Sequence, residues 1–249
     1  MRSAIILAAG KGTRMKSALN KVMHPVSNKP MIGHIVCSLR KAGVDNIVVV
    51  VGHGAESVRE YLGDSVRYAV QEPQLGTGHA VMQAQCLADL DGDTLILNGD
   101  GPCIQSETID RVFAANADSE MTVLTAVLPD GERYGRIIRN AEGYVERIVE
   151  AKDCTPQELA VTEINTGIFC FKNRLLFAHL KEIRNDNAQQ EYYLTDLVAI
   201  FNQCGLRVNA LVADDPQETM GVNDRIDLAK AQKWMTRHEC ERHMRNGVT

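Results

Sequence analysis

The chain has 249 residues, of which 45% are hydrophobic and 24% charged, so it has enough apolar material for one large or two small globular domains. Its net charge of −5 argues against a broad nucleic-acid-binding surface, and no apolar run reaches the length of a membrane-spanning helix. The seven cysteines contain no CxxC pair, which argues against a zinc cluster or a disulfide framework. Free thiols, and a start without signal-peptide character, predict a cytoplasmic protein.

The first predicted element is a buried strand, Ala4–Ala8, which runs into a loop with Gly10 and Gly12. Glycines let a backbone approach a ligand closely, and successive N–H groups in such a loop can bind an anion. Arg14 and Lys21 add the positive charge that phosphate oxygens need. The loop lacks the third glycine of the dinucleotide-binding pattern and the Gly-Lys-Ser/Thr end of a Walker loop. On these residues alone, a phosphate site and an ordinary turn with surface cations are equal alternatives.

Helices and strands alternate after this loop. Helical spacing of apolar residues predicts a helix over Met31–Ala42, and a β-branched run predicts a strand over Asn46–Val51. A short helix, Glu56–Leu62, and a strand, Val66–Val70, follow. This order predicts an α/β fold with a Rossmann-like, doubly wound sheet that is mixed but mainly parallel.

A second glycine-rich loop, around Gly76 and Thr77, comes before a predicted helix over Ala80–Ala88. Free N–H groups at a helix start suit a phosphate or a nucleotide. Gln71, just upstream, has an amide that can pair with the edge of a base. The other interpretation is a capping loop with Thr77 as the helix cap, and the two are compatible.

A third motif, Asn98-Gly99-Asp100, follows a predicted strand over Thr94–Leu97. A carboxylate just past a buried strand is well placed to bind Mg²⁺ beside phosphates, because Mg²⁺ takes one or two carboxylates together with substrate oxygens. A simple turn aspartate is the alternative, and this motif alone favours the turn.

The middle of the chain predicts a helix, two further strands and a hairpin. We expect the helix over Thr108–Asn116, the strands over Met121–Leu128 and Glu163–Phe171, and the hairpin from residues 134–138 and 145–150. Gly135, Glu150 and Asn165 fall at strand ends or turns, where directional hydrogen bonds to a sugar could form. For each of them taken singly, turn chemistry or a solvated face is the better interpretation.

The last part of the chain predicts three helices and one strand. The helices are expected over Leu175–Ile183, Glu191–Cys204 and Arg225–Arg245, and the strand over Val208–Val212. We therefore expect a catalytic domain over residues 1–224 and a separate C-terminal helix within residues 225–249.

Taken together, the motifs resemble the sugar-nucleotide pyrophosphorylases. Within that family they are most similar to the N-terminal uridylyltransferase domains of the bifunctional bacterial enzymes that make UDP-N-acetylglucosamine. The matching segments occur in order over nearly the whole chain: Leu7–Met15, Lys21, Gln71, Gln74–Ala80, Gly99-Asp100, Tyr134–Ile137, Ile148–Asp153, Ile164–Gly167, Tyr193–Asp196 and Gly221–Arg225.

The resemblance implies the nucleotide-diphospho-sugar transferase fold, uridylyl transfer from UTP to N-acetylglucosamine 1-phosphate, and Mg²⁺ as cofactor. Arg14 and Lys21 would be catalytic, and Asp100 and Asn223 would bind the metal. The sugar phosphate would be held by Gly135, Glu150 and Asn165. The nucleotide would be held by Leu7, Ala8, Ala9, Gly10, Gln71, Gly76 and Thr77.

Two features depart from the family pattern. Asn98 stands where a tyrosine is usual, and Gly101–Ile104 stands where Val-Pro-Leu is usual, so another sugar phosphate or nucleotide donor stays open. The chain also ends about where the family's left-handed β-helix domain begins, so we expect a monomer, or a trimer if that domain is present in the native protein. A nucleotide-sugar-binding domain without turnover is the alternative from another functional class. The four residues implied for catalysis and metal binding argue against it.

Overall fold

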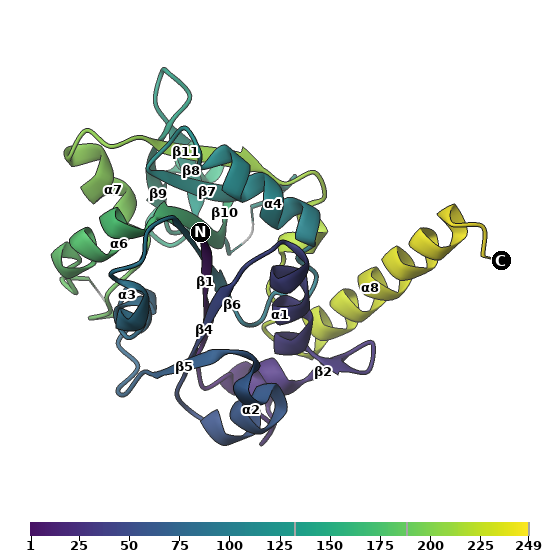
Figure 1. Ribbon diagram of the computed structural model, residues 1–249. Coiled ribbons are helices and arrows are strands. Elements are labelled where there is room, and N and C mark those ends of the chain that lie inside the picture. Colours follow the sequence, from purple (N-terminus) through teal and green to yellow (C-terminus); the bar gives the residue numbers. More distant parts are fainter. Residues whose placement is uncertain (132, 188, 249) are drawn as a thin grey trace.

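A computed structural model of the protein describes residues 1–131, 133–187 and 189–248. Its centre is one nine-stranded sheet, with a separate two-stranded ribbon at its side (Figure 1). The strands are β1 (Arg2–Ala8), β2 (Pro25–Val26), β3 (Lys29–Pro30), β4 (Asn46–Val51), β5 (Arg67–Val70), β6 (Asp93–Asn98), β7 (Met121–Val127), β8 (Arg136–Arg139), β9 (Val145–Val149), β10 (Glu163–Lys172) and β11 (Val208–Val212).

The sheet is mixed and mainly parallel, as the alternating pattern predicts. Its strand order is β11-β7-β10-β6-β1-β4-β5, and β8 and β9 attach to β10. The pairs β1–β4, β1–β6, β4–β5 and β7–β11 are parallel. Strand β10 runs antiparallel to β6 and β7. It also pairs with β8, which forms an antiparallel hairpin with β9. The Rossmann-like α/β fold is therefore confirmed.

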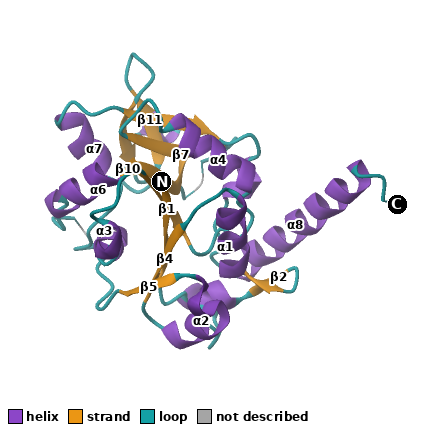
Figure 2. Cartoon of the chain, in the orientation of Figure 1, coloured by secondary structure: helices purple, strands orange, loops and turns teal. Residues whose placement is uncertain are grey.

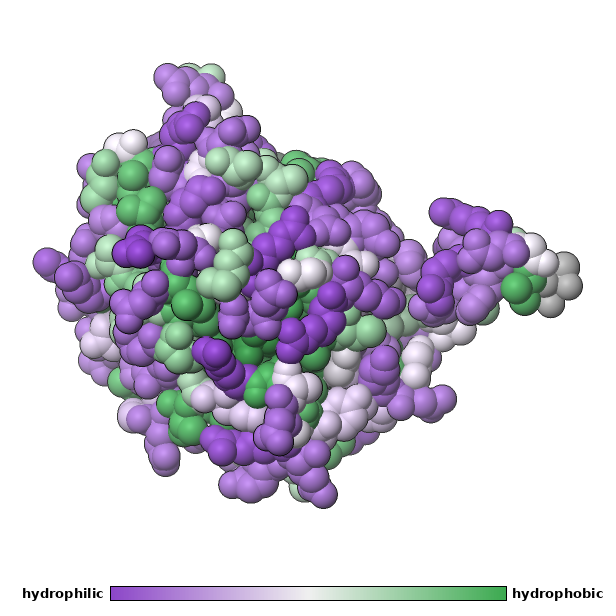
Figure 3. Space-filling view, viewed as in Figure 1, coloured by the Kyte–Doolittle hydropathy of each residue, from purple (hydrophilic) through white to green (hydrophobic). Residues whose placement is uncertain are grey.

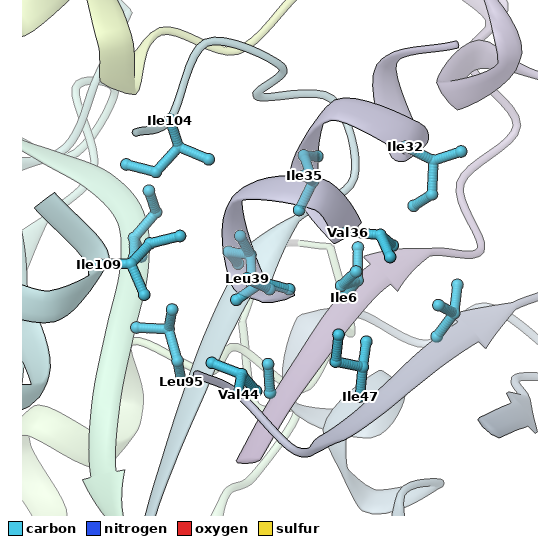
Figure 4. Close-up of a cluster of buried hydrophobic side chains, with 14 of the residues drawn as sticks. Ile6, Ile32, Ile35, Val36, Leu39, Val44, Ile47, Leu95, Ile104 and Ile109 are labelled. Atoms are coloured by element: carbon cyan, nitrogen blue, oxygen red, sulfur yellow. The ribbon is translucent and has the colours of Figure 1, made fainter. Parts of the chain in front are cut away.

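Helices cover both faces of the sheet (Figure 2). They are α1 (Met31–Lys41), α2 (Ala55–Leu62), α3 (Thr77–Met82), α4 (Ser106–Ala115), α5 (Pro156–Leu159), α6 (Asn173–His179), α7 (Asp196–Gln203) and α8 (Arg225–Arg245). Successive side chains of a strand point to opposite faces. Accordingly, Ile6 packs with residues of α1, α2 and α4, whereas Ile5 packs with residues of α3, α6 and α7. Figure 4 shows part of the first cluster, with Ile32, Ile35 and Leu39 of α1 over Ile6 and Ile47.

Two predicted helices differ most from their expected boundaries, and the helix expected over Leu175–Ile183 is shorter, at Asn173–His179. The helix expected over Ala80–Ala88 ends at Met82 and is followed by a short 3-10 turn. The helix expected from Glu191 begins only at Asp196. The reason is tertiary, because the Tyr192 amide donates to Leu75 in the loop before α3, and the Tyr192 carbonyl accepts from Gly78 in α3 and not from a residue of its own helix.

Helix α8 leaves the body of the molecule and projects from it (Figure 1). Its first half is anchored, because Ala231 is buried in a small apolar cluster and Trp234 packs against the same cluster. Beyond Met235 the helix surface is mostly polar, as Figure 3 shows by its purple colour. Among the described residues, none of the helices is long and apolar enough to span a bilayer. All seven cysteines are free thiols in this structure.

Candidate active site

A cavity of about 270 Å³ opens at the carboxyl ends of β1 and β6, where the first glycine loop follows β1. We call it the β1 cavity. All seven residues expected to hold the nucleotide line it, namely Leu7, Ala8, Ala9, Gly10, Gln71, Gly76 and Thr77, and so do Lys21 and Asp100. Parallel sheets bind ligands at this edge.

The glycine loop folds directly against Lys21. Gly12 has a positive φ of 60°, and a Cβ there would lie 2.6 Å from the Cβ of Lys21. Gly10 has open space on its Cα, with no atom of the described residues within 4 Å of a Cβ placed there. The two glycines therefore have different roles. Gly12 permits close packing against Lys21, and Gly10 leaves room beside the backbone.

The second loop is held by the segment before α7. Gly76 has φ +104°, and a Cβ on it would lie 2.6 Å from the carbonyl oxygen of Tyr192. The Thr77 hydroxyl accepts a hydrogen bond from the Leu194 amide at 3.0 Å. Thr77 is thus not the cap of α3, because the N-cap position is Gly76 and lacks a side-chain bond. Gln71 is buried, and its amide nitrogen donates to Gly76 O at 2.9 Å.

The four residues expected to be catalytic or metal-binding are brought together. The Lys21 ammonium forms an ion pair with Asp100 and lies 3.3 Å from Oδ1 of Asn223. Arg14 donates to the same Asn223 oxygen at 2.8 Å. Residues far apart in sequence thus form one cluster of two cations and two oxygen ligands beside the β1 cavity.

The donor set of Asp100 and Asn223 fits a hard divalent cation. A carboxylate oxygen and an amide oxygen are ligands that Mg²⁺ accepts, with substrate oxygens and waters completing its octahedron. In the structure these two oxygens already share one positive group, the Lys21 ammonium. That shared contact shows that both point to a place where a cation can sit.

Asn223 has supports that the sequence motifs do not reveal. Its backbone amide donates to Oδ2 of Asp227 at 3.1 Å, and Arg133 forms an ion pair with the same oxygen at 2.8 Å. Asp224 caps α8 by accepting from the amides of Ile226 and Asp227. An acidic residue three positions after an aspartate cap is a readable helix-start signal, and it could have indicated Asp227.

A second cavity, of about 580 Å³, lies beside β10. We call it the β10 cavity. Two of the three residues expected at the sugar line it, Glu150 and Asn165. Gly135 is not among the lining residues of this cavity. It contacts the site through Asn165, because the Gly135 carbonyl accepts from the Asn165 amide at 2.8 Å. A bulge in β10 between Asn165 and Ile168 re-aims the strand here.

Further polar groups line the β10 cavity and were not expected from the sequence: Lys152, Asp153, Asn187, Gln189, Glu191, Tyr193 and Thr195. Desolvation, and then the nearby negative charge of Asp153, raise the pKa of Glu150. The Asn98 side chain lies close to Gly167, where a Cβ would be 2.6 Å from its Nδ2. Gly167 also has a positive φ of 78°. A glycine therefore suits this bulge because of its backbone conformation and because of the close contact with Asn98.

The two cavities are contiguous. Leu7, Thr77, Asn98 and Glu191 line both of them. The cluster of Lys21 and Asp100 lies on the β1 side of this shared wall. Two ligands bound in the two cavities would therefore meet at the ends of β1 and β6, next to the charged cluster.

Comparisons with known proteins agree with this geometry. The family model described as nucleotidyl transferase matches residues 3–216. Curated relatives named "Bifunctional protein GlmU" include one from Brevibacillus brevis, 52% identical over 249 residues, which covers 99% of this chain and 54% of the relative. Another, from Limosilactobacillus reuteri, is 52% identical over 251 residues and covers 100% of this chain and 55% of that relative. The chain thus spans about half the length of these relatives.

A solved structure from Bacillus anthracis, assigned as a glucose-1-phosphate thymidylyltransferase and crystallised with a sucrose, has a similar fold. The TM-score is 0.75 at 22% sequence identity, over 94% of this chain and 95% of that chain. At this identity the likeness concerns the fold alone.

Proposed function

The chain belongs to the nucleotidyl transferase family, and from that premise we propose that it transfers a uridylyl group from UTP to N-acetylglucosamine 1-phosphate. The products are UDP-N-acetylglucosamine and pyrophosphate. The relatives named as bifunctional GlmU proteins support this choice of substrates, because their similarity extends over the whole of this chain.

One observation carries the proposal, namely the shared wall of the two cavities. The β1 cavity has a glycine loop, a buried amide and a lysine, which suits a base and its phosphates. The β10 cavity has carboxylate, amide and hydroxyl groups, which suit the hydroxyls of a sugar. A nucleotide in the first and a sugar phosphate in the second would bring their phosphates together beside Lys21.

The proposed chemistry is a single in-line displacement. A phosphate oxygen of the sugar phosphate forms a bond to the α-phosphorus of UTP, and the bond to the bridging oxygen of pyrophosphate breaks. The attacking phosphate is already an anion, so no side chain has to remove a proton. Lys21 and Arg14 would stabilise the negative charge that develops on the phosphates. Catalysis then depends on orientation and on charge.

Asp100 and Asn223 would hold Mg²⁺. When bound, the ion would neutralise phosphate charge and orient the triphosphate. The Lys21 ammonium contacts both ligand oxygens, so a bound ion would compete with it for them and would leave the ammonium free to contact phosphate oxygens. Glu150 and Asn165 would orient the sugar from the β10 side, with Gly135 supporting Asn165 through the backbone.

We also propose that residues 1–224 form the catalytic unit and that the first half of α8 completes its packing. This assignment is supported by the contacts of Ala231 and Trp234 with the small apolar cluster. A cytoplasmic location stays a prediction, which the seven free thiols support.

The test is pyrophosphate release in the presence of Mg²⁺. UTP should be combined with N-acetylglucosamine 1-phosphate or glucose 1-phosphate, and CTP, dTTP and ATP should be tried as other donors. Release with UTP and the N-acetyl sugar, at least tenfold faster than with any other pair, is the expected result. Faster release with another pair would refute the substrate assignment. No release from folded protein that binds UTP would favour a binding domain without turnover.

A further inference from the structure

A buried carboxylate joins the two segments that carry the proposed metal ligands. Asp100 belongs to the loop between β6 and α4, and Asn223 belongs to the segment between β11 and α8. Glu218 lies in the second segment, in the 3-10 turn Pro216–Thr219, and is only 4% exposed. A carboxylate is rarely buried to this extent unless it has specific partners.

Its partners are at the start of α4. Oε1 of Glu218 accepts from the Thr108 hydroxyl at 2.8 Å, and Oε2 accepts from the Gln105 amide at 3.2 Å. The first N–H groups of a helix need acceptors, and the side chain of Gln105, the N-cap residue of α4, does not provide one. A negative charge at this position is also favourable in the helix dipole. Glu218 thus caps α4 from a different part of the chain.

The same two segments meet again next to the metal ligands. The Val222 amide donates to the Asp100 carbonyl at 2.9 Å. A Cβ on Gly221 would lie 3.2 Å from Oδ1 of Asp100. Val222 and Cys103, one from each segment, are buried in the same apolar cluster. The segments are therefore joined at the ligand end by these contacts and at the other end by Glu218.

Between these two ends the segments do not fill the space. Both segments line a chamber of about 120 Å³, through Asp100, Glu218, Gly221 and Asn223 among others. Close packing fixes a distance only where side chains touch. Across this chamber the distance between the segments depends on the contacts at its ends, to which Glu218 contributes its two hydrogen bonds.

We propose that Glu218 is a positioning residue, which holds the segments of Asp100 and Asn223 at the separation that a divalent cation requires. The inference rests on the proposed function, because it takes these two residues as the metal ligands. Groups that orient metal ligands without touching the ion change metal affinity about ten- to hundredfold when they are lost.

Two pairs of variants separate this role from a general effect on folding. Glu218→Met removes both acceptors at similar length. Glu218→Gln keeps both contacts, because its amide oxygen can accept from Gln105 and its amide nitrogen can donate to the Thr108 hydroxyl. Thr108→Val removes one bond and keeps the shape, whereas Thr108→Ser keeps the hydroxyl.

The first measurement is the affinity for Mn²⁺ in the presence of UTP, followed by electron paramagnetic resonance of the free ion. Glu218→Met should bind Mn²⁺ about tenfold more weakly than the wild type, and Thr108→Val about threefold, whereas Glu218→Gln and Thr108→Ser should stay within about twofold. Asp93→Asn is the control, because Asp93 is the first residue of β6, at the end of the strand away from Asp100, where it bonds to Asn116 and Lys172. It should leave the affinity unchanged. Unchanged affinity in folded Glu218→Met would overturn the inference.

The second measurement is hydrogen exchange at the Val222 amide, without metal or nucleotide. Exchange should be at least tenfold faster in Glu218→Met than in the wild type, and unchanged in Glu218→Gln. Full protection of Val222 in Glu218→Met would overturn the positioning role, whatever the substrates are. Failure of the wild type to release pyrophosphate would instead refute the proposed function, so the two failures are distinct.

Discussion

Lys21 is the residue on which the charge balance of the site depends. Its ammonium is only partly exposed and contacts both Asp100 and Asn223. A divalent cation between those two oxygens would repel it, whereas the phosphates of a nucleotide would attract it. Metal binding and phosphate binding are therefore coupled through one side chain, and each should strengthen the other.

Replacing Lys21 with alanine should separate these two effects. We expect kcat to fall about a hundredfold, because one charge that stabilises the transition state is lost, and KM for UTP to rise much less. Mn²⁺ should bind more tightly than to the wild type when no nucleotide is present, because Asp100 has lost its competing partner. Steady-state kinetics and metal titration measure the two. Lys41→Ala on the exposed end of α1 is the control, and weaker Mn²⁺ binding to Lys21→Ala would refute the competition.

The Glu218 carboxyl should make stability depend on pH. Burial, and then the negative charges of Asp215 and Asp214, raise its pKa, while the bonds from Thr108 and Gln105 oppose the shift. A carboxyl with a raised pKa binds its proton more tightly in the folded state than in the unfolded state, where the pKa is about 4.3. Ionisation therefore lowers the unfolding free energy as pH rises from about 4.3 through the raised value.

Comparison with Glu218→Gln reveals this contribution. The unfolding free energy of the wild type, relative to that of Glu218→Gln, should be highest below a pH of about 4 and should fall as the pH rises to neutral. Urea unfolding at several pH values measures the difference. A relative stability that rises with pH would mean that the carboxylate form is the favoured one.

At the scale of elements, local sequence determines most of the fold. Strands β4 and β11 and helix α8 have the predicted boundaries, and α1 differs from its prediction by one residue. Continuous β-branched runs, helical spacing and a cap signal are local, so they can be read from the sequence. The late start of α7 cannot, because it depends on backbone bonds to a loop more than a hundred residues away.

The site shows the same limit. The glycine loops and Asp100 stand out as motifs because each lies at the end of a predicted strand or the start of a helix. The pairing of Lys21 with Asp100, and the bond from Arg14 to Asn223, arise only when distant segments meet. The alternative interpretation, with Thr77 as the cap of α3, is wrong because α3 begins at Thr77 itself and the Thr77 hydroxyl accepts from the distant Leu194 amide.

Gly76→Ala tests the contact between the loop before α3 and the segment before α7. The new Cβ would strain a positive φ and would collide with the carbonyl of Tyr192. We expect the unfolding free energy to fall by about 3 kcal/mol. Gly43→Ala is the matched control, because Gly43 also has a positive φ but a Cβ on it would have nothing within 4 Å in the part of the chain that the structure describes. It should lose about 1 kcal/mol, and equal losses in chemical denaturation would refute the collision.

At the scale of the whole molecule, α8 is the feature that stands apart (Figure 1). Beyond Met235 its surface is mostly polar and exposed, with ion pairs along its own length that include Arg237–Glu241 and Arg242–Glu239. Such a surface has little apolar area to bury against a second copy. The chain of 249 residues should therefore sediment as a monomer of 27.5 kDa. A concentration-dependent trimer in analytical ultracentrifugation would contradict this.

The most direct test of direct transfer across the shared wall is the stereochemistry at the α-phosphorus. Of the nucleophilic side chains that line the β1 cavity, Lys21 pairs with Asp100 and the Thr77 hydroxyl accepts from the Leu194 amide. With one diastereomer of UTP that carries sulfur on its α-phosphate, the configuration of the sugar-nucleotide product can be read by ³¹P magnetic resonance. A single in-line attack by the sugar phosphate predicts inversion. Retention would mean two displacements and a nucleotidyl-enzyme intermediate, and would contradict the account.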